Sequence, residues 1–121
     1  MTPRQRAAAA RAKRHHDKAM GWVDIAKAHR ADMNGELEKT ANFMALRYEM
    51  DACRYARRAG LEPSSTILHI SAASIAEDLG LWGVVYGVAC LGMDGEPTPT
   101  QEETLRDMIR RSGRILGYTA G

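Results

Sequence analysis

The 121-residue sequence has little of what disulfide scaffolds, zinc sites and β-sheets are built from. Its two cysteines, Cys53 and Cys90, are too far apart for a zinc-binding pair, and we expect both to be small core residues rather than a disulfide. There are one phenylalanine and four prolines, whereas alanine, methionine and arginine are frequent. This composition favours helices over a β-sandwich.

Long hydrophobic runs are also missing. The longest apolar stretch, residues 81–93, is shorter than the roughly 20 residues that a membrane-spanning helix needs. The N-terminus lacks the apolar segment of a secretory signal. We therefore expect no membrane association and a cytoplasmic location.

Motifs of catalysis are absent as well. The sequence contains no glycine-rich phosphate loop, nucleophile elbow or HExxH helix. His15 and His16 are adjacent, so on a helix they point about 100° apart and are poorly placed to share a metal. His29 and His69 have no cysteine or carboxylate at ligand spacing. We expect a protein that is not an enzyme and has no metal or cofactor.

What remains predicts an all-α protein, a compact bundle of about five helices in a single domain over residues 1–121. Thr2 is the expected N-cap of the first helix, and Gly60 and Gly80 are expected to end the second and third. For the last helix, Thr100 to Glu103 has the spacing of a capping box. The expected helices cover residues 3–33, 36–59, 65–79, 81–93 and from 100 onward.

Two segments need interpretation. In the first helix, Trp22, Ile25, His29 and Met33 share one face, which we expect to face the core. Residues 81–93 are rich in valine and aromatic residues and are compatible with a buried strand. We favour a helix there, because no partner strand is predicted elsewhere in the sequence.

Charge is concentrated at the N-terminus. Residues 1–18 carry a net charge of +5, and the rest of the chain carries −3. The residues that form a cationic stripe along one helix face are Arg4, Arg11, Arg14 and Lys18. We expect this segment to project from the body or fray, and we favour a solvated terminus as its simplest interpretation. Contact of the stripe with nucleic acid or with an acidic protein surface is the alternative, and no aromatic residue interleaves with these cations along the segment to support base stacking.

A second basic stripe follows the polar side of the second helix. Its members are Arg47, Arg54, Arg57 and Arg58. Asp51 lies one turn from Arg47 and from Arg54, so local ion pairing explains much of this stripe. The alternative is an arginine-rich face for a partner, because arginine is enriched at the centres of protein interfaces.

Residues 69–97 resemble one tetratricopeptide-type repeat, a two-helix hairpin with small residues at fixed offsets. The residues that carry the resemblance are Ala73, Ala76, Gly80, Trp82, Val85, Ala89, Gly92 and Pro97. Val85 and Gly92 depart from the alanines usual in that family, and no second copy lies 34 residues away. The resemblance implies binding of a protein or peptide in a helical groove, without chemistry.

We therefore expect a non-enzymatic adaptor, regulator or inhibitor that occupies the surface of a partner protein. The alternative is a nucleic-acid-associated protein that uses its basic N-terminal helix. Homodimerisation is a further hypothesis, because a helix as apolar as residues 81–93 is unsuited to the surface of a monomer.

Overall fold

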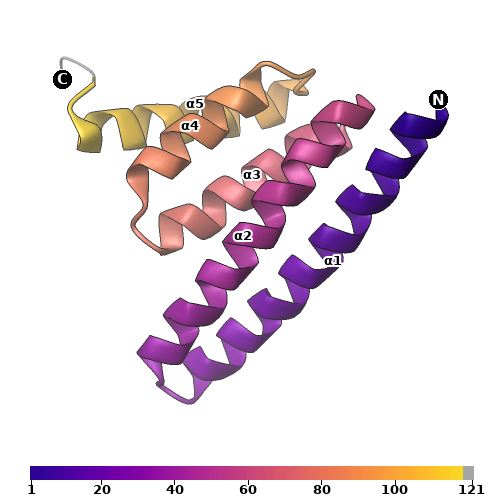
Figure 1. Ribbon diagram of the computed structural model, residues 1–121. Coiled ribbons are helices and arrows are strands. Elements are labelled where there is room, and N and C mark those ends of the chain that lie inside the picture. The colour runs from indigo at the N-terminus through magenta and orange to yellow at the C-terminus, as the bar shows by residue number, and fades with distance from the viewer. Residues whose placement is uncertain (119–121) are drawn as a thin grey trace. The chain divides into compact units, whose positions relative to one another are not determined.

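A computed structural model describes residues 1–118, and within them every regular element is an α-helix (Figure 1). The prediction of an all-α chain is confirmed, and residues 82–93 form a helix rather than a strand. The helices of the described residues are α1 (Pro3–Ala31), α2 (Gly35–Ala59), α3 (Ser64–Asp78), α4 (Trp82–Met93) and α5 (Pro99–Leu116).

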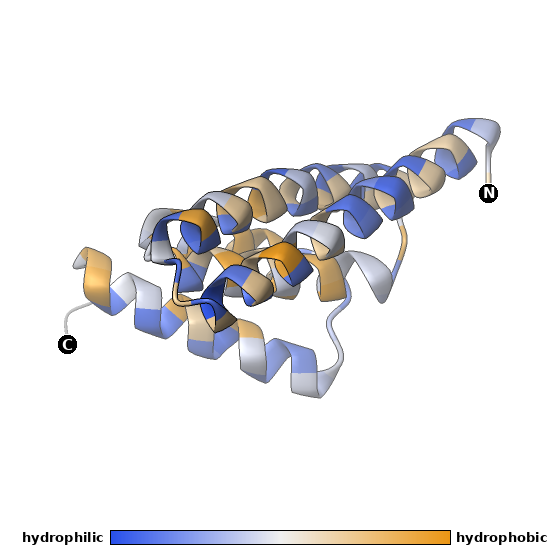
Figure 2. Cartoon of the chain, turned by 90° about the horizontal axis from the view of Figure 1, so that it is seen from below, coloured by the Kyte–Doolittle hydropathy of each residue, from blue (hydrophilic) through white to orange (hydrophobic). Residues whose placement is uncertain are grey.

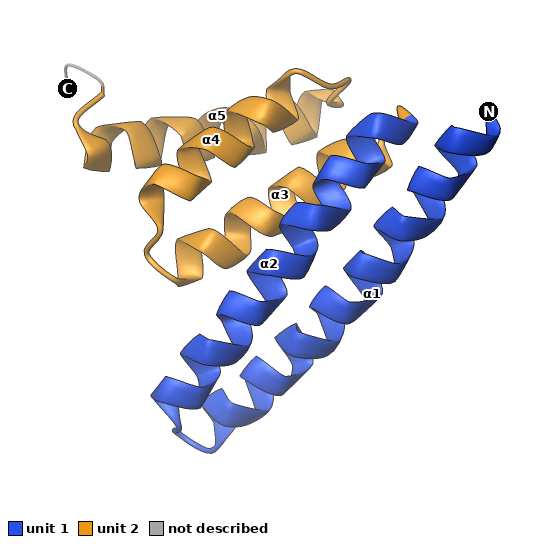
Figure 3. Ribbon diagram, viewed as in Figure 1, with its two compact units in different colours: residues 1–59 blue, residues 60–121 orange. Residues whose placement is uncertain are grey.

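The helices group into two compact units, which Figure 3 shows in different colours. Unit 1 is residues 1–59 and contains α1 and α2, and unit 2 begins at Gly60 and contains α3, α4 and α5. The single domain over residues 1–121 stays a prediction, and residues 119–121 lie outside the described part of the chain.

Unit 1 is an antiparallel helical hairpin in which alanine forms the seam (Figure 1). The buried residues of α1 are Ala12, Ala19 and Ala26, which recur every seven residues. Seven residues are close to two helical turns, so these methyl groups lie in one line along the helix. The buried alanines of α2 include Ala45, Ala52 and Ala59, with the same spacing. Side chains this small allow the two backbones to approach closely.

The expectation that Trp22, Ile25, His29 and Met33 face the core is wrong for Ile25 and Met33, whereas Trp22 and His29 are half-buried. Ile25 is 42% exposed and Met33 is 92% exposed. The buried residues of α1 are alanines, and the distance between packed helices depends on the size of the side chains at the contact, so the large apolar residues of α1 flank this seam or face solvent.

The turn between the helices also differs from the expectation. Instead of continuing to Met33, α1 ends at Ala31 with Asp32 as its C-cap, and Met33 adopts a left-handed conformation with φ of 58°. Asn34 then accepts a hydrogen bond through Oδ1 from the backbone N–H of Leu37 at 3.2 Å. The chain therefore reverses at Met33, one residue before the Asn34–Gly35 pair. Asn34 is the N-cap of α2.

Residues 1–18 do not project from unit 1, contrary to the expectation. They belong to the continuous helix α1, and Ala12 is 3% exposed because it packs against α2. The predicted N-cap Thr2 is confirmed, with Thr2 and Gln5 forming a capping box through hydrogen bonds of 3.0 and 2.8 Å. Blue, hydrophilic segments recur along this helix, which starts at the N label in Figure 2.

Unit 2 is a hairpin of α3 and α4 with α5 packed mainly against α4. Gly80 has φ of 70° and follows α3 as predicted, since glycine tolerates the left-handed conformation that ends a helix. Gly60 has φ of 65° and follows α2 in the same way. The apolar helix α4 is not covered on all sides: Val85 and Ala89 are buried, whereas Leu91 is 39% exposed. Homodimerisation through α4 stays a prediction.

The predicted start of α5 is wrong by two residues. The N-cap is Thr98, which forms a capping box with Gln101 through hydrogen bonds of 3.2 and 2.9 Å. Pro99 takes the first helical position, where its missing N–H is no loss and its fixed φ suits a helix. The sequence offers two capping boxes with the same spacing, one from Thr98 to Gln101 and one from Thr100 to Glu103. Pro99 favours the first, because it then takes the first helical position.

We expect Gly92→Ala and Gly87→Ala to have opposite effects on stability. A Cβ atom at Gly92 lies 3.0 Å from Cδ2 of Leu105 and 3.1 Å from Cβ of His69, and both neighbours are buried. A Cβ atom at Gly87 meets nothing within 4 Å. Gly92→Ala should lower the free energy of unfolding by about 1–2 kcal/mol through overpacking. Gly87→Ala should raise it by about 0.5–1 kcal/mol. Urea denaturation followed by circular dichroism measures both, and a stabilising Gly92→Ala would contradict the packing described.

Candidate functional site

Cations of α1 and tyrosines of α2 meet along one side of unit 1. The Arg11 guanidinium carbon lies 5.6 Å from the centre of the Tyr55 ring, and Nζ of Lys18 lies 5.6 Å from the centre of the Tyr48 ring. The His15 ring lies between them, 5.3 Å from Tyr55 and 6.1 Å from Tyr48. We call this surface the cationic–aromatic face, and its residues are Arg4, Arg11, His15, Lys18, Tyr48, Arg54, Tyr55 and Arg58.

The alternation on this face follows from matched periods in the sequence. Arg4, Arg11 and Lys18 are spaced by seven residues on α1, and Tyr48 and Tyr55 are spaced by seven on α2. The alanine seam has the same period. Antiparallel packing on that seam therefore brings the two series together along its side.

The expectation that no aromatic residue interleaves with the cations is corrected by this arrangement. The expectation held within residues 1–18, which contain no tyrosine, tryptophan or phenylalanine. The tyrosines come from α2, at least 30 residues further along the chain. The signal present in the sequence is the shared seven-residue period, which becomes informative only once α1 is known to pair with α2.

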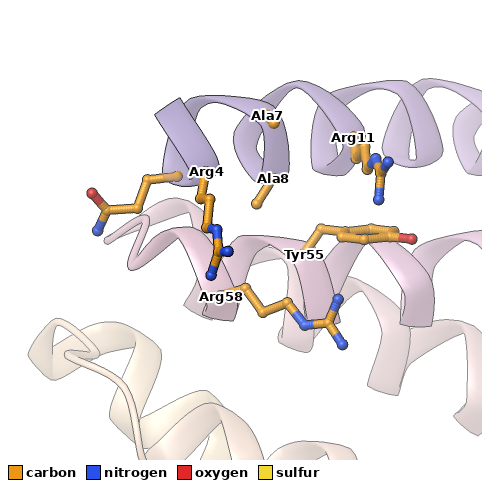
Figure 4. A pocket seen from close by; sticks show the side chains of 7 residues that line it. Arg4, Ala7, Ala8, Arg11, Tyr55 and Arg58 are labelled. Atoms are coloured by element: carbon orange, nitrogen blue, oxygen red, sulfur yellow. The ribbon is translucent and has the colours of Figure 1, made fainter. Parts of the chain in front are cut away.

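Three guanidinium groups surround Tyr55. Those of Arg54 and Arg58 lie 5.5 and 5.8 Å from the ring centre, in addition to that of Arg11. Figure 4 shows Arg11 on one side of the ring and Arg58 on the other. Contacts between a cation and the electron-rich face of an aromatic ring are favourable. The ring therefore helps to hold several like charges close together.

A hollow of about 470 Å³ opens beside Tyr55 (Figure 4). We call it the Tyr55 hollow, and its lining residues are Arg4, Gln5, Ala7, Ala8, Arg11, Tyr55 and Arg58. The space exists because Ala7 and Ala8 have short side chains where α1 passes Tyr55. Three lining residues are cationic and none is a carboxylate. The electrostatic character of the hollow therefore favours an anion.

The structure brings together only some of the residues of the two predicted stripes. From the first stripe, Arg4, Arg11 and Lys18 lie on the cationic–aromatic face. Arg14 is exposed and lies about 40° around α1 from Lys18 at 100° per residue, beside the face.

From the second stripe, Arg54 and Arg58 join the face beside Tyr55. Arg47 and Arg57 are exposed elsewhere on α2. The local ion pairing expected of Asp51 is present with Arg54 at 3.0 Å.

A buried carboxylate lies at the helix interface behind this face. The Glu49 side chain is fully buried, and its two oxygens lie 2.8 and 3.1 Å from Nδ1 of His16. Glu49 was not among the predicted site residues, although an acidic residue among Ala45, Leu46, Ala52 and Cys53 is itself a signal. The alanine seam is repetitive, whereas the contact between His16 and Glu49 forms at one position only. This contact therefore favours a single register of α1 against α2.

The two cysteines are free thiols. Burial raises the pKa of the Cys53 thiol to about 12, and the nearby Glu49 carboxylate adds to the shift. Burial also raises the pKa of Cys90, which is half-buried. A thiol with a pKa this high remains protonated at neutral pH and is a poor nucleophile, so Cys53 has the character of a packing residue.

Within residues 1–118, no cluster of three or more histidine, cysteine or acidic side chains is arranged to hold a metal ion. None of the helices described has both the length and the apolar character needed to cross a bilayer.

Comparison with known proteins gives no relative: no family model, curated protein or solved structure matches the chain. The tetratricopeptide resemblance of residues 69–97 stays a prediction.

We expect His16→Ala to destabilise unit 1 more than His15→Ala does. Removing the His16 imidazole takes away a partner of a fully buried carboxylate, which should cost about 1–3 kcal/mol. The adjacent His15 donates through Nδ1 to the exposed carbonyl of Arg11 at 2.8 Å, so its loss should cost less than about 1 kcal/mol. Urea denaturation at pH 7 compares the two variants. Equal costs would show that the Glu49 contact adds nothing to stability.

Proposed function

We propose that this protein binds nucleic acid through the cationic–aromatic face of unit 1. The observation that supports the proposal is the alternation of cations with tyrosines along one line of the hairpin. Guanidinium and ammonium groups bind phosphate oxygens, and aromatic rings offer surfaces on which bases stack. An acidic protein surface needs the cations alone, so the tyrosines favour nucleic acid over the acidic partner that the sequence left open.

The dimensions of the face suit a polyanion. From Arg4 to Lys18 the helix rises about 21 Å, which is about six times the phosphate spacing along one strand of a duplex. Arg4, Arg11 and Lys18 are exposed, with Arg58 on α2 beside them. Several phosphates therefore have a cation within reach at once. Nothing in this arrangement selects a base sequence, so we propose binding through backbone charge and stacking.

We expect the affinity for a labelled 20-nucleotide single strand to fall steeply with salt. Four phosphate contacts give a slope of log K against log salt of about −3, because each neutralised phosphate of a single strand contributes about −0.7. Arg11→Gln and Lys18→Gln should each make the slope less negative by about 0.7. Fluorescence anisotropy between 50 and 300 mM NaCl measures the slope.

Lys27→Gln is the matched control for this experiment. Lys27 is exposed on the same helix but lies about 140° around it from Arg4. The control removes one positive charge and should leave the slope unchanged. If all three variants change the salt slope equally, binding depends on net charge and not on the cationic–aromatic face. Absence of binding by the wild type at 50 mM NaCl would reject the proposal.

A protein-binding adaptor, regulator or inhibitor is the second candidate function, and it is supported by a surface of α2 that adjoins the cationic–aromatic face and shares Arg54 with it. Phe43 and Met50 on α2 are 42% and 41% exposed. Arg47 and Arg54 lie between and beyond them at helical spacing, so apolar and arginine side chains share one side of α2. Exposed aromatic and arginine residues are typical of the centres of protein interfaces.

The two candidate functions predict different results in an affinity capture from nuclease-treated lysate. If the adaptor function holds, a stoichiometric protein should remain bound after nuclease treatment and moderate salt. Phe43→Ser with Met50→Ser should abolish its capture, whereas Lys18→Gln should retain it. A captured protein that is lost with Lys18→Gln, and not with the double variant, would contradict the adaptor surface proposed here.

A further inference from the structure

The Tyr55 hollow has a shape and chemistry that the rest of the cationic–aromatic face lacks. Its volume of about 470 Å³ lies within the range of about 300–1,000 Å³ that is usual for small-molecule sites. Ala7 and Ala8 form an apolar wall on α1, and Tyr55 provides an aromatic plane on α2. The guanidinium groups of Arg4, Arg11 and Arg58 surround this space (Figure 4).

Each part of the hollow matches a part of a nucleotide. Guanidinium groups bind phosphate in a charge-assisted and frequently bidentate manner. Planar bases stack on aromatic rings and on guanidinium planes, and Arg11 and Arg58 each lie within 6 Å of the centre of the Tyr55 ring. A base laid on one of these guanidinium groups continues a stack that begins at Tyr55. The alanine methyl groups can cover the edge of the base without competing for its polar atoms.

A base that is paired in a duplex is not available to such a hollow. It is stacked between its neighbours and its Watson–Crick edge is occupied, so entry requires unstacking that costs a few kcal/mol. A base in a single strand enters at little cost. The hollow therefore discriminates between strands by shape, whereas the exposed cations act on any phosphate chain.

We infer that the Tyr55 hollow holds one unpaired nucleotide, with its phosphate on Arg4 and its base stacked on the guanidinium plane of Arg11 or Arg58 beside Tyr55 and covered by the alanine wall. This inference rests on the proposed nucleic-acid function and deepens it, since it makes single-stranded nucleic acid the preferred ligand. The hollow lies at the end of the face nearest the N-terminus of α1, so one nucleotide is anchored there while the following phosphates run along Arg11 and Lys18.

The test fills the hollow without changing its charge. Ala8→Leu places a larger apolar side chain in the wall, and Ala10→Leu makes the same change at an exposed alanine outside the lining. The probes are a labelled 15-nucleotide thymidine strand and a blunt 15-base-pair duplex, measured by fluorescence anisotropy at 100 mM NaCl. Melting curves by circular dichroism establish that each variant is folded.

We expect the wild type to bind the single strand about tenfold more tightly than the duplex, the gain typical of stacking one base. Ala8→Leu should remove this preference by weakening single-strand binding about tenfold, with the duplex affinity and its salt slope unchanged. Ala10→Leu should behave as the wild type. If Ala8→Leu fails to fold, Tyr55→Leu replaces it, because losing the aromatic plane should abolish the same preference.

Three results would overturn the inference. They are no strand preference in the wild type, a preference that survives both Ala8→Leu and Tyr55→Leu, and equal competition by inorganic phosphate and a nucleoside monophosphate. The third result would indicate a phosphate site with no place for a base. In each of these cases salt-dependent binding still supports the proposed function, whereas a wild type that binds neither probe rejects both.

Discussion

The close packing of α1 on α2 through alanine is the constraint on which the candidate site depends. Ala12, Ala19 and Ala26 are buried at intervals of seven residues, and Ala45, Ala52 and Ala59 repeat that interval on α2. A seam of methyl groups allows a short distance between helix axes. It also leaves the larger side chains at the edges of the seam, where they meet those of the other helix. The cationic–aromatic face is one such edge.

The position of Tyr55 at this edge allows several arginine side chains to lie close together. Arg11, Arg54 and Arg58 surround one tyrosine ring, and each contact with the ring offsets part of the repulsion among them. Exposed cations contribute little to stability, so the role that we propose for this cluster is binding rather than folding. The Tyr55 hollow lies beside these cations, because Ala7 and Ala8 are too small to fill the space that larger residues of α1 would occupy.

The contact of His16 with Glu49 complements the seam. Alanine packing alone allows more than one register of α1 against α2, since a methyl group fits equally well against many others. A fully buried carboxylate that meets one imidazole is more demanding, because a shift of α1 along α2 would separate the two. In unit 2 the corresponding restriction is steric: Gly92 lies so close to Leu105 and His69 that only glycine fits without displacing them. Each unit thus combines small residues with one specific contact.

By itself the sequence determined the local structure of this protein, because helices, caps and stops depend on neighbouring residues. The number of helices, the N-cap at Thr2 and the glycines after α2 and α3 were all predicted correctly. The start of α5 was misplaced because two threonines offer the same capping pattern, and a proline at the first helical position decides between them. The heptad spacing of Arg4, Arg11 and Lys18 was also visible in the sequence.

Only the tertiary structure decided what those residues meet. Tyr48 and Tyr55 lie far along the chain from the cations, and no local rule says that the helix carrying them packs on α1. The core face of α1 was misassigned because hydrophobicity ranked Trp22 and Ile25 above alanine, whereas close helix packing depends on small size. Glu49 was overlooked for a related reason: a buried carboxylate is understandable only when its partner, His16, is known.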